Sequence, residues 1–378
     1  MIWRIFVTVY LLIICTTSKS DDLYGWIGRM EGSSIKSSVG LWDLATGRLI
    51  ESYQSDLPLV PASTTKLVST YAILKTLKPN FQLNTELWGD LRGSIIVGDL
   101  IVKGVGDPCL TSERIWLLAN ELKVLGVTQI TGRVRLDQSA FDTQVFGSGW
   151  QNISADTMPP VLPLSVNFNR ENGRVVRNPE RLAVGIIQDI IRSSGIPIQG
   201  KVESRGIPVK LISFPSLPLR DLVTSINKIS NNFMIEMLVK YFGGGTWSGG
   251  ISRIQEFYAN FLDLGPDKVA ITDGSGLSKD NRISARTLAI VLRAAWNDFE
   301  VGPEMVGSLK TVGGEPWSLH KNPNLARRVR CKTGHLKDVI SVCGYLQVPD
   351  GRIRVFAIIL NGPCKDRDAW ELVDRWAS

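Results

Sequence analysis

Three short polar motifs stand in one order along the 378-residue chain. They are Ser63-Thr64-Thr65-Lys66, Ser230-Asn231-Asn232 and Lys332-Thr333-Gly334. The patterns Ser-x-x-Lys and Ser-x-Asn also occur elsewhere in the chain, whereas Lys-Thr-Gly occurs once. Serine, lysine and amide groups of this kind activate a nucleophile and move protons in acyl transfer. The ordered set, rather than any single motif, therefore predicts a serine acyl-transfer site.

The first motif supplies the predicted nucleophile, Ser63, and its base, Lys66. Ser63 opens a run to Leu77 whose apolar residues recur at helical spacing, so we expect it in the first turn of a helix. There, unpaired N–H groups and the helix dipole favour negative charge on the hydroxyl oxygen. Lys66 lies on the same helical face, and burial together with the nearby cation Lys332 would lower its pKa. An isolated Ser-x-x-Lys could instead be an ordinary helix cap.

The second motif separates two predicted helices, residues 219–229 and 233–242. At such a junction the side chains of Ser230 and Asn232 can project into a site. We expect Ser230 to relay a proton to the leaving amine and Asn232 to orient the lysine and the substrate. A capping pair is the alternative interpretation of this motif alone.

The third motif lies on a predicted strand, and two more strands follow it in antiparallel order; the ranges are 328–333, 339–348 and 352–360. Lys332, with Thr333, is predicted to hold a substrate carboxylate, and Gly334 to let the substrate backbone approach closely. The N–H groups of Ser63 and His335 are expected to form an oxyanion hole.

These motifs together are a signature of penicillin-binding proteins and class A β-lactamases. The chain resembles the type-four (class C) low-molecular-mass penicillin-binding proteins, the D-alanyl-D-alanine carboxypeptidase/endopeptidase class. The 167 residues between Ser63 and Ser230 (230 − 63) match the insertion known in that group and exceed class A spacing. Further family-like strings are Gly106-Asp107-Pro108, residues 164–169, and residues 273–278 followed by Asn281. The resemblance implies a serine D,D-peptidase acting on peptidoglycan peptides through an acyl-enzyme, with β-lactams as covalent inhibitors, no cofactor and no metal.

The resemblance also implies the fold. We expect a penicillin-binding/β-lactamase-like α/β (α+β) fold, in which helices flank an antiparallel five-stranded sheet. Predicted strands at 39–43 and 48–53 would join the three C-terminal strands in that sheet. The expected D,D-peptidase domain comprises residues 21–84 and 162–378, and one small α/β domain is inserted at 85–161. A second accessory domain, usual in the family, is almost absent.

His335 departs from the family pattern, in which Thr or Ser usually follows Lys-Thr-Gly. The imidazole would replace a hydroxyl that binds the substrate carboxylate, and its protonation would place a cation beside Lys332. One hypothesis is therefore that acylation strengthens as pH falls from about 8 to 6. The alternative is a solvent-facing ring with no kinetic role.

Composition is consistent with a secreted enzyme. Residues 1–20 combine Arg4, an apolar stretch at 5–14 and a small polar end, which predicts a signal peptide too short to span a bilayer. We therefore expect export to the periplasm or cell envelope. The net charge of +7 would favour contact with anionic cell-wall polymers or, at most peripherally, with a membrane surface. Because the chain has no long Lys/Arg run, a scattered surface bias is the preferred interpretation, and nucleic acid is not indicated. Oligomeric state is not indicated.

Four cysteines follow the predicted signal peptide: Cys109, Cys331, Cys343 and Cys364. A hairpin symmetric about Lys337 would place Cys331 opposite Cys343, where a cross-strand disulfide is conceivable. Buried free thiols are the favoured interpretation. No Cys/His spacing suggests a metal site.

Two other functions fit parts of the sequence. A β-lactamase or esterase of the same fold would need a deacylating pair, for which Glu256 and Asn260 have the class A spacing. Their surroundings, however, predict a plain amphipathic helix. A non-catalytic cell-wall-binding module is disfavoured because every motif residue is present. A Ser-His-Asp triad is disfavoured because His320 and His335 are the only histidines.

Overall fold

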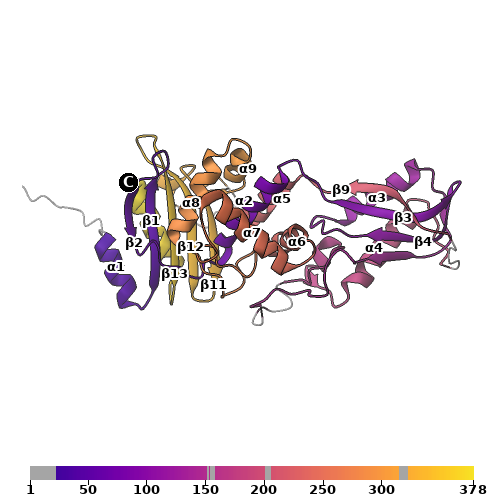
Figure 1. The fold of residues 1–378 in the computed structure, drawn as a ribbon, viewed down its shortest axis with the longest axis horizontal. Coiled ribbons are helices and arrows are strands. Elements are labelled where there is room, and N and C mark those ends of the chain that lie inside the picture. Colours follow the sequence, from indigo (N-terminus) through magenta and orange to yellow (C-terminus); the bar gives the residue numbers. More distant parts are fainter. Residues whose placement is uncertain (1–22, 151–152, 154–157, 201–205, 315–321) are drawn as a thin grey trace, which may run out of the picture.

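The computed structural model describes residues 23–150, 153, 158–200, 206–314 and 322–378. The predicted signal peptide at 1–20 lies outside these residues. The main sheet is antiparallel, with the strand order β10-β11-β12-β13-β1-β2 (Figure 1). Its strands are β1 (Lys36–Asp43), β2 (Leu49–Tyr53), β10 (Lys310–Thr311), β11 (Val329–Leu336), β12 (Val339–Gln347) and β13 (Ile353–Asn361). The five predicted strands are thus present, and β10 adds a two-residue sixth.

Helices cover both faces of this sheet. On one face, α1 (Leu23–Gly32) and α10 (Asp366–Ala377) pack with Trp26, Trp370 and Trp376 against the strands. On the other face lie α2 (Thr65–Leu77), α5 (Leu219–Ile229), α6 (Asn232–Phe242), α7 (Trp247–Leu262), α8 (Ala285–Asn297) and α9 (Gly302–Gly307). N- and C-terminal segments therefore build a single domain around the sheet.

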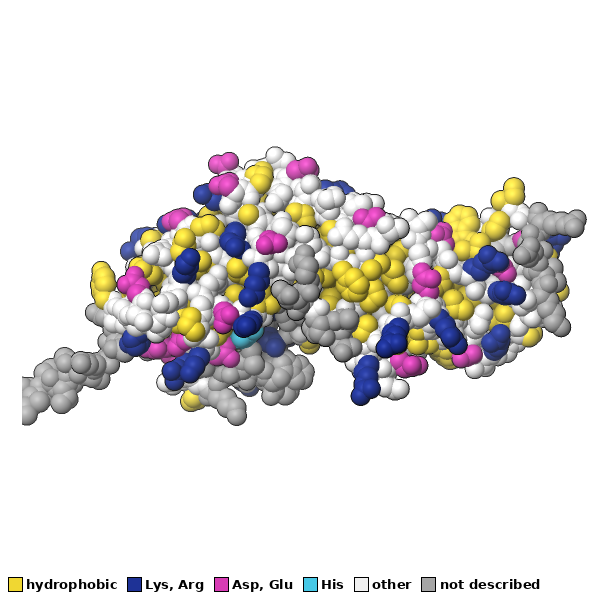
Figure 2. Space-filling model, turned by 90° about the horizontal axis from the view of Figure 1, so that it is seen from below, with side chains coloured by type: hydrophobic (Ala, Val, Ile, Leu, Met, Phe, Trp, Pro, Cys, Tyr) yellow, Lys and Arg dark blue, Asp and Glu magenta, His cyan; other side chains and the backbone are white. Residues whose placement is uncertain are grey.

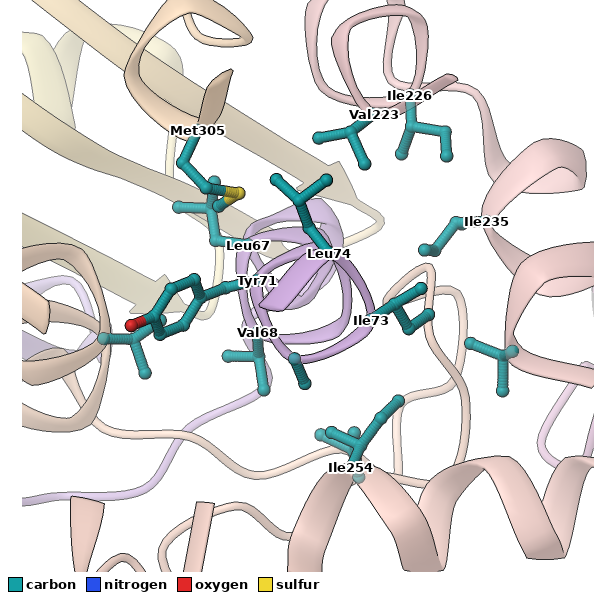
Figure 3. Packing of buried hydrophobic residues seen from close by; sticks show 14 of the residues in the cluster. Leu67, Val68, Tyr71, Ile73, Leu74, Val223, Ile226, Ile235, Ile254 and Met305 are labelled. Atoms are coloured by element: carbon teal, nitrogen blue, oxygen red, sulfur yellow. The ribbon is translucent and has the colours of Figure 1, made fainter. Parts of the chain in front are cut away.

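The central helix of that domain is α2. All its residues from Thr65 to Leu74 are buried, so helices and strands surround it rather than cover a single face. Figure 3 shows Leu67, Val68, Tyr71, Ile73 and Leu74 projecting from α2 in different directions. They meet side chains of the neighbouring helices, among them Val223, Ile226, Ile235, Ile254 and Met305. This packing fixes the helix that carries Lys66.

The hairpin of β11 and β12 turns at Lys337 and Asp338, because Leu336 pairs with Val339. Cys331 is therefore opposite Gly344, and Cys343 is opposite Lys332. The two cysteines belong to the hydrophobic clusters on opposite faces of the sheet. A disulfide between them is excluded by this register, and all four cysteines of the described chain are free thiols.

A second sheet forms the far end of the elongated molecule (Figure 1). Its strands are β3 (Asn84–Arg92), β4 (Ile95–Lys103), β5 (Gln129–Ile130), β6 (Val134–Asp137) and β9 (Val209–Pro215). The helices α3 (Ser112–Val124) and α4 (Pro179–Ser193) bury Ile115, Leu118, Ile187 and Ile191 in the same core. A small hairpin, β7 (Arg170–Glu171) and β8 (Arg174–Val175), precedes α4.

The predicted boundary of the inserted unit at residue 161 is wrong. β9 pairs with β3 along its length, and α4 packs in the second core, so this unit draws on the chain as far as residue 215. Conversely, Phe141, Trp150 and Val161 lie in the core of the first domain. The insertion thus leaves the main domain, returns to it, and leaves again before β9.

Charged side chains of both signs are interspersed over the face of the molecule shown in Figure 2. This distribution agrees with a scattered surface bias rather than a continuous basic patch. Within the described ranges, no helix combines the length and the hydropathy needed to cross a bilayer.

Candidate active site

Ser63 lies in a tight turn between β2 and α2. The turn is a 3-10 helix, η1 (Ala62–Thr64), which precedes α2 rather than forming its first α-helical turn. Ala62 has a positive φ of 48° and is fully buried. Asn361 brackets the incoming chain, accepting from the Val60 N–H at 2.9 Å and donating to the Val60 carbonyl at 3.0 Å. The Ser341 hydroxyl donates to the Pro61 carbonyl at 2.6 Å. Side chains of β12 and β13 in the main sheet therefore fix the turn that carries Ser63.

Lys66 points its amine at Ser63. Its Nζ is 3.0 Å from Ser63 Oγ, 2.6 Å from Asn232 Oδ1 and 2.7 Å from the Ser275 carbonyl. The last two groups are acceptors only, so they take two N–H bonds from the lysine. In a neutral amine the remaining position is the lone pair, which then faces the Ser63 hydroxyl. The geometry is that of a base placed to receive the serine proton.

Electrostatics favour that neutral form. Burial of Lys66, together with the nearby cation Lys332, depresses the pKa of its amine well below the ordinary value, although Glu236 and Asp273 oppose the shift. Burial, and then Lys310, lowers the pKa of Lys332 to about 8. A lysine with a lowered pKa is neutral above that pKa, so Lys66 becomes able to accept a proton as pH rises through it. Lys332 retains its charge at pH 7.

The Ser230-Asn231-Asn232 motif forms the junction of two helices. Ser230 ends α5 in the left-handed conformation, with φ 58° and ψ 40°. The side chain of Asn231 caps α6 by accepting from the Met234 N–H at 3.0 Å, so the middle residue of the motif has a structural role. Asn232 begins α6 and directs Oδ1 to Lys66. The cap thus fixes the direction in which Asn232 projects.

Lys332 connects the second and third motifs. Its Nζ donates to Ser230 Oγ at 3.0 Å and to the Thr333 carbonyl at 2.7 Å. Because Lys332 donates to this hydroxyl, Ser230 retains its own proton for another acceptor. The structure therefore brings Ser63, Lys66, Ser230, Asn232 and Lys332 into one connected site. The role of the Thr333 side chain in binding a carboxylate stays a prediction.

Gly334 is where β11 passes closest to the serine turn. A Cβ at this position would lie 2.7 Å from the Ser63 nitrogen, 3.0 Å from Ala62 Cβ and 2.4 Å from Ser341 Oγ. The motif predicts close approach of a substrate to Gly334, whereas the structure shows close approach of the nucleophile turn. This contact brings the Ser63 N–H beside β11, as an oxyanion hole shared with the His335 N–H would require. That hole stays a prediction.

We expect Gly334→Ala to slow acylation by roughly 100-fold, because the added methyl group must push β11 away from Ser63 and an error of about 1 Å at a reacting group has that scale. Stopped-flow acylation by a chromogenic β-lactam would measure the rate. Gly185→Ala in α4 is the matched control, since its Cβ would meet nothing within 4 Å. Equal acylation rates for Gly334→Ala and the parent would contradict the steric argument.

His335 does not occupy the place that the sequence analysis gave it. Its Nε2 contacts Asp366 Oδ1 at the start of α10, and both side chains are largely exposed. Lys332 and Gly334 alternate with Thr333 and His335 along β11, so the imidazole lies on the face opposite the Lys332 amine. The hypothesis of a cationic imidazole beside the substrate carboxylate is therefore not supported by this geometry. An imidazole without a kinetic role fits it better.

A buried carboxylate organises the loop behind Lys66. Asp273 accepts four hydrogen bonds, from the Gly276 N–H at 2.8 Å, the Ser278 N–H at 2.6 Å, Asn281 Nδ2 at 2.7 Å and Trp150 Nε1 at 2.8 Å. The loop places the Ser275 carbonyl on Lys66. Sequence reasoning noted residues 273–278 and Asn281 only as family-like strings. The dense Gly/Ser pattern around one Asp was the signal that a structured turn lies there.

A second polar contact joins the inserted segment to α6. Lys240 is fully buried; its Nζ lies 2.6 Å from Asp142 Oδ1 and 2.6 Å from the Gln144 carbonyl. The amine also lies 4.4 Å from the centroid of the Trp247 ring. Paired acceptors and an aromatic face make burial of this cation tolerable. Sequence reasoning did not identify this pair.

Glu256, the alternative deacylating residue, is exposed on α7. The face of α7 that packs into the domain is formed by Trp247, Ile251, Ile254 and Tyr258. Glu256 therefore belongs to the outer side of an amphipathic helix, as its sequence surroundings predicted. Its spacing to Asn260 does not create a class A deacylation site.

The fold and the site define a serine hydrolase of the penicillin-binding type. The sequence profile of the D-Ala-D-Ala carboxypeptidase 3 (S13) family matches residues 29–175 and 168–378. The chain therefore belongs to the D-Ala-D-Ala carboxypeptidase 3 (S13) family of serine peptidases. The family assignment made from the motifs is confirmed.

Individual relatives agree with this assignment. A D-alanyl-D-alanine carboxypeptidase of Actinomadura sp. (strain R39) is 25% identical over 421 residues, covering 86% of this chain and 78% of the relative. D-alanyl-D-alanine carboxypeptidase DacB of Haemophilus influenzae is 25% identical, with 83% of each chain covered. The crystal structure of penicillin binding protein 4 from H. influenzae has a TM-score of 0.80 at 20% identity, covering 93% of this chain and 99% of that one. The predicted fold class is thereby confirmed.

Proposed function

We propose that this protein is a serine D-Ala-D-Ala carboxypeptidase, endopeptidase or both, which cleaves peptidoglycan stem peptides through an acyl-enzyme on Ser63. The observation that carries the proposal is the Lys66 amine, which lies 3.0 Å from Ser63 Oγ while its other bonds go to two fixed acceptors. A buried amine held in this way can accept the serine proton in its neutral form, which the lowered pKa of Lys66 favours.

The reaction follows from these positions. Ser63 Oγ attacks the carbonyl carbon of the scissile amide, and its proton passes to Lys66. Ser230, whose oxygen already accepts from Lys332, gives its proton to the leaving amine, and the proton taken up by Lys66 replaces it on Ser230. Lys332 attracts the terminal carboxylate of the substrate. Water then attacks the acyl carbon, and its proton passes through Lys66 to Ser63 Oγ, which leaves as a hydroxyl and releases the shortened peptide.

The same geometry supports covalent inhibition by β-lactams, because their strained amide presents a carbonyl to Ser63 and a carboxylate to Lys332. A penicillin G-acylated predatory endopeptidase from Bdellovibrio bacteriovorus shares the fold, with a TM-score of 0.58 at 16% identity. The arrangement of this chain's own residues supports extending that reactivity to Ser63.

Incubation with pentapeptide monomer and cross-linked dimer, followed by mass spectrometry, tests the proposed function. We expect loss of one terminal alanine from the monomer, cleavage of the dimer into monomers, or both. Ser63→Ala should yield neither product. Absence of both products with the parent protein, correctly folded and labelled by penicillin, would refute peptidase activity on these substrates.

We also propose that the protein acts in the periplasm or cell envelope. Its proposed substrate lies there, and the composition of residues 1–20 is typical of an export signal. Cell fractionation of the full chain with an activity-independent tag would detect it. Recovery in the cytoplasm after removal of unprocessed precursor would contradict this location.

A further inference from the structure

Three polar side chains project from α6 at intervals of four residues: Asn232, Glu236 and Lys240. Residues at this spacing share one face of a helix. Asn232 contacts Lys66, and Lys240 pairs with Asp142 in the inserted segment. Glu236, between them, is fully buried and takes no part in the reaction described above. A buried carboxylate that the chemistry does not use calls for another role.

Glu236 has two well-defined partners. One carboxylate oxygen accepts from the Ser275 N–H at 2.6 Å, and the other accepts from Trp247 Nε1 at 2.8 Å. The carbonyl of the same Ser275 accepts from Lys66 Nζ at 2.7 Å. Glu236 therefore binds the N–H of Ser275, and the carbonyl of the same residue binds the base, Lys66.

We propose that Glu236 is a positioning residue for acyl transfer, which fixes the Ser275 carbonyl so that the Lys66 amine keeps its lone pair on Ser63. This inference deepens the proposed function and rests on it. Asp273 restrains the loop from the other side, through the Gly276 and Ser278 N–H groups. Without Glu236, the Gly274–Ser275 peptide would lose the partner of its N–H, and Asp273 alone would restrain the next peptide, which carries the Ser275 carbonyl.

Glu236 also acts on Lys66 through its charge. The titratable groups that face it are Asp273 from the loop and Lys66 from α2, while α7 contributes the uncharged indole N–H of Trp247. Burial, and then Asp273, raises the pKa of Glu236 to about 7. When ionised, Glu236 raises the pKa of Lys66 and so opposes the effect of burial. Glu236 thus acts on Lys66 in two ways that substitutions can separate: through its hydrogen bond to the Ser275 N–H and through its charge.

Two substitutions separate these contributions. Glu236→Gln keeps an oxygen within reach of the Ser275 N–H but removes the charge and replaces the acceptor of the Trp247 N–H with an NH2 group. Because the charge is lost, the rising limb of acylation rate against pH should move to lower pH by about one unit. Glu236→Asp keeps the charge but shortens the side chain by one methylene group. It should therefore lower the rate at least about tenfold at every pH, with the limb unmoved.

The measurement is the rate constant for acylation by a chromogenic β-lactam between pH 5 and 9, with circular dichroism melts to establish that each variant is folded. Glu256→Gln, the same change at an exposed position of α7, is the matched control and should reproduce the parent profile. A Glu236→Gln profile that superimposes on the parent after scaling would overturn the proposal. Glu236→Asp as fast as the parent would overturn it as well, and this variant provides the test if Glu236→Gln does not fold.

Different results would contradict the proposed function and the role of Glu236. If the parent protein itself is not acylated at Ser63, the proposed function fails. If the parent is acylated and Glu236→Gln leaves the pH profile unchanged, only the role of Glu236 fails. A merely structural role would lower the melting temperature or the amount of active protein without moving the limb.

Discussion

Replacing Ser63 with Ala should abolish covalent labelling by penicillin. The parent protein is expected to form a one-to-one adduct, because Ser63 Oγ is the hydroxyl that the buried Lys66 amine faces at 3.0 Å. Intact-mass spectrometry after incubation with penicillin would give the stoichiometry, and peptide mapping would locate the adduct. The penicilloyl group should also leave slowly, since the structure provides no class A deacylation pair at Glu256.

Ser33→Ala is a suitable control for this experiment. Ser33 begins another copy of the Ser-x-x-Lys pattern, but it is exposed after α1 and precedes β1. Its replacement should leave labelling unchanged. An adduct that survives Ser63→Ala, or that maps to another peptide, would remove Ser63 from the mechanism.

Lys66→Ala should slow acylation by roughly 100-fold or more, the usual scale for loss of a general base. The pH profile should change as well. In the parent, the rate should fall as pH drops through the depressed pKa of Lys66, because the amine then becomes protonated. The variant should lack this limb. Stopped-flow acylation at several pH values measures both effects.

Lys123→Ala, at an exposed position of α3, provides the control for removal of a lysine. The Lys66→Ala variant leaves the Asn232 and Ser275 oxygens without their donor, so its melting temperature should be determined beside its rate. A folded variant that loses only a few-fold in rate would mean that another group accepts the serine proton.

Local patterns in the sequence predicted the elements that carry the motifs. The helix after Ser63, the helix pair around Ser230 and the C-terminal antiparallel strands were expected within a few residues of their observed bounds. These elements have strong periodicity and clear turn signals, which are local properties. Non-local pairing was not accessible in this way. The pairing of β9 with β3, more than 100 residues earlier, decides where the inserted unit ends.

Strand parity explains two differences between the expected and the observed hairpin. A two-residue turn at Lys337 and Asp338 places the hairpin centre between residues rather than on Lys337. This half-residue difference moves Cys331 and Cys343 to opposite faces of the sheet. The same alternation turns the His335 side chain away from Lys332. The motif therefore identified the strand and its lysine, but not the orientation of the neighbouring side chain.

The supporting residues of the site could not be recognised from sequence for a different reason. Glu236 and Lys240 are the charged residues of an otherwise mostly apolar helix, so the sequence pattern alone would place them on its exposed side. Their partners lie on other elements. Only the fold shows that both are buried. Because buried polar groups need hydrogen-bond partners, the partners of these two residues indicate what each side chain does.

The hydrogen bond from Trp150 to Asp273 and the ion pair of Lys240 with Asp142 bear on how this enzyme could be shortened or recombined. Trp150 and Asp142 both belong to the stretch of the insertion that returns to the main domain before β9. A version trimmed at the predicted boundaries would leave the Asp273 carboxylate without its indole partner. It would also leave the buried Lys240 ammonium, about two helical turns from Asn232 along α6, without its counter-ion. A chimera that exchanges the distal sheet should therefore retain residues 140–150 with the peptidase half, because Phe141 and Trp150 belong to the core of that half.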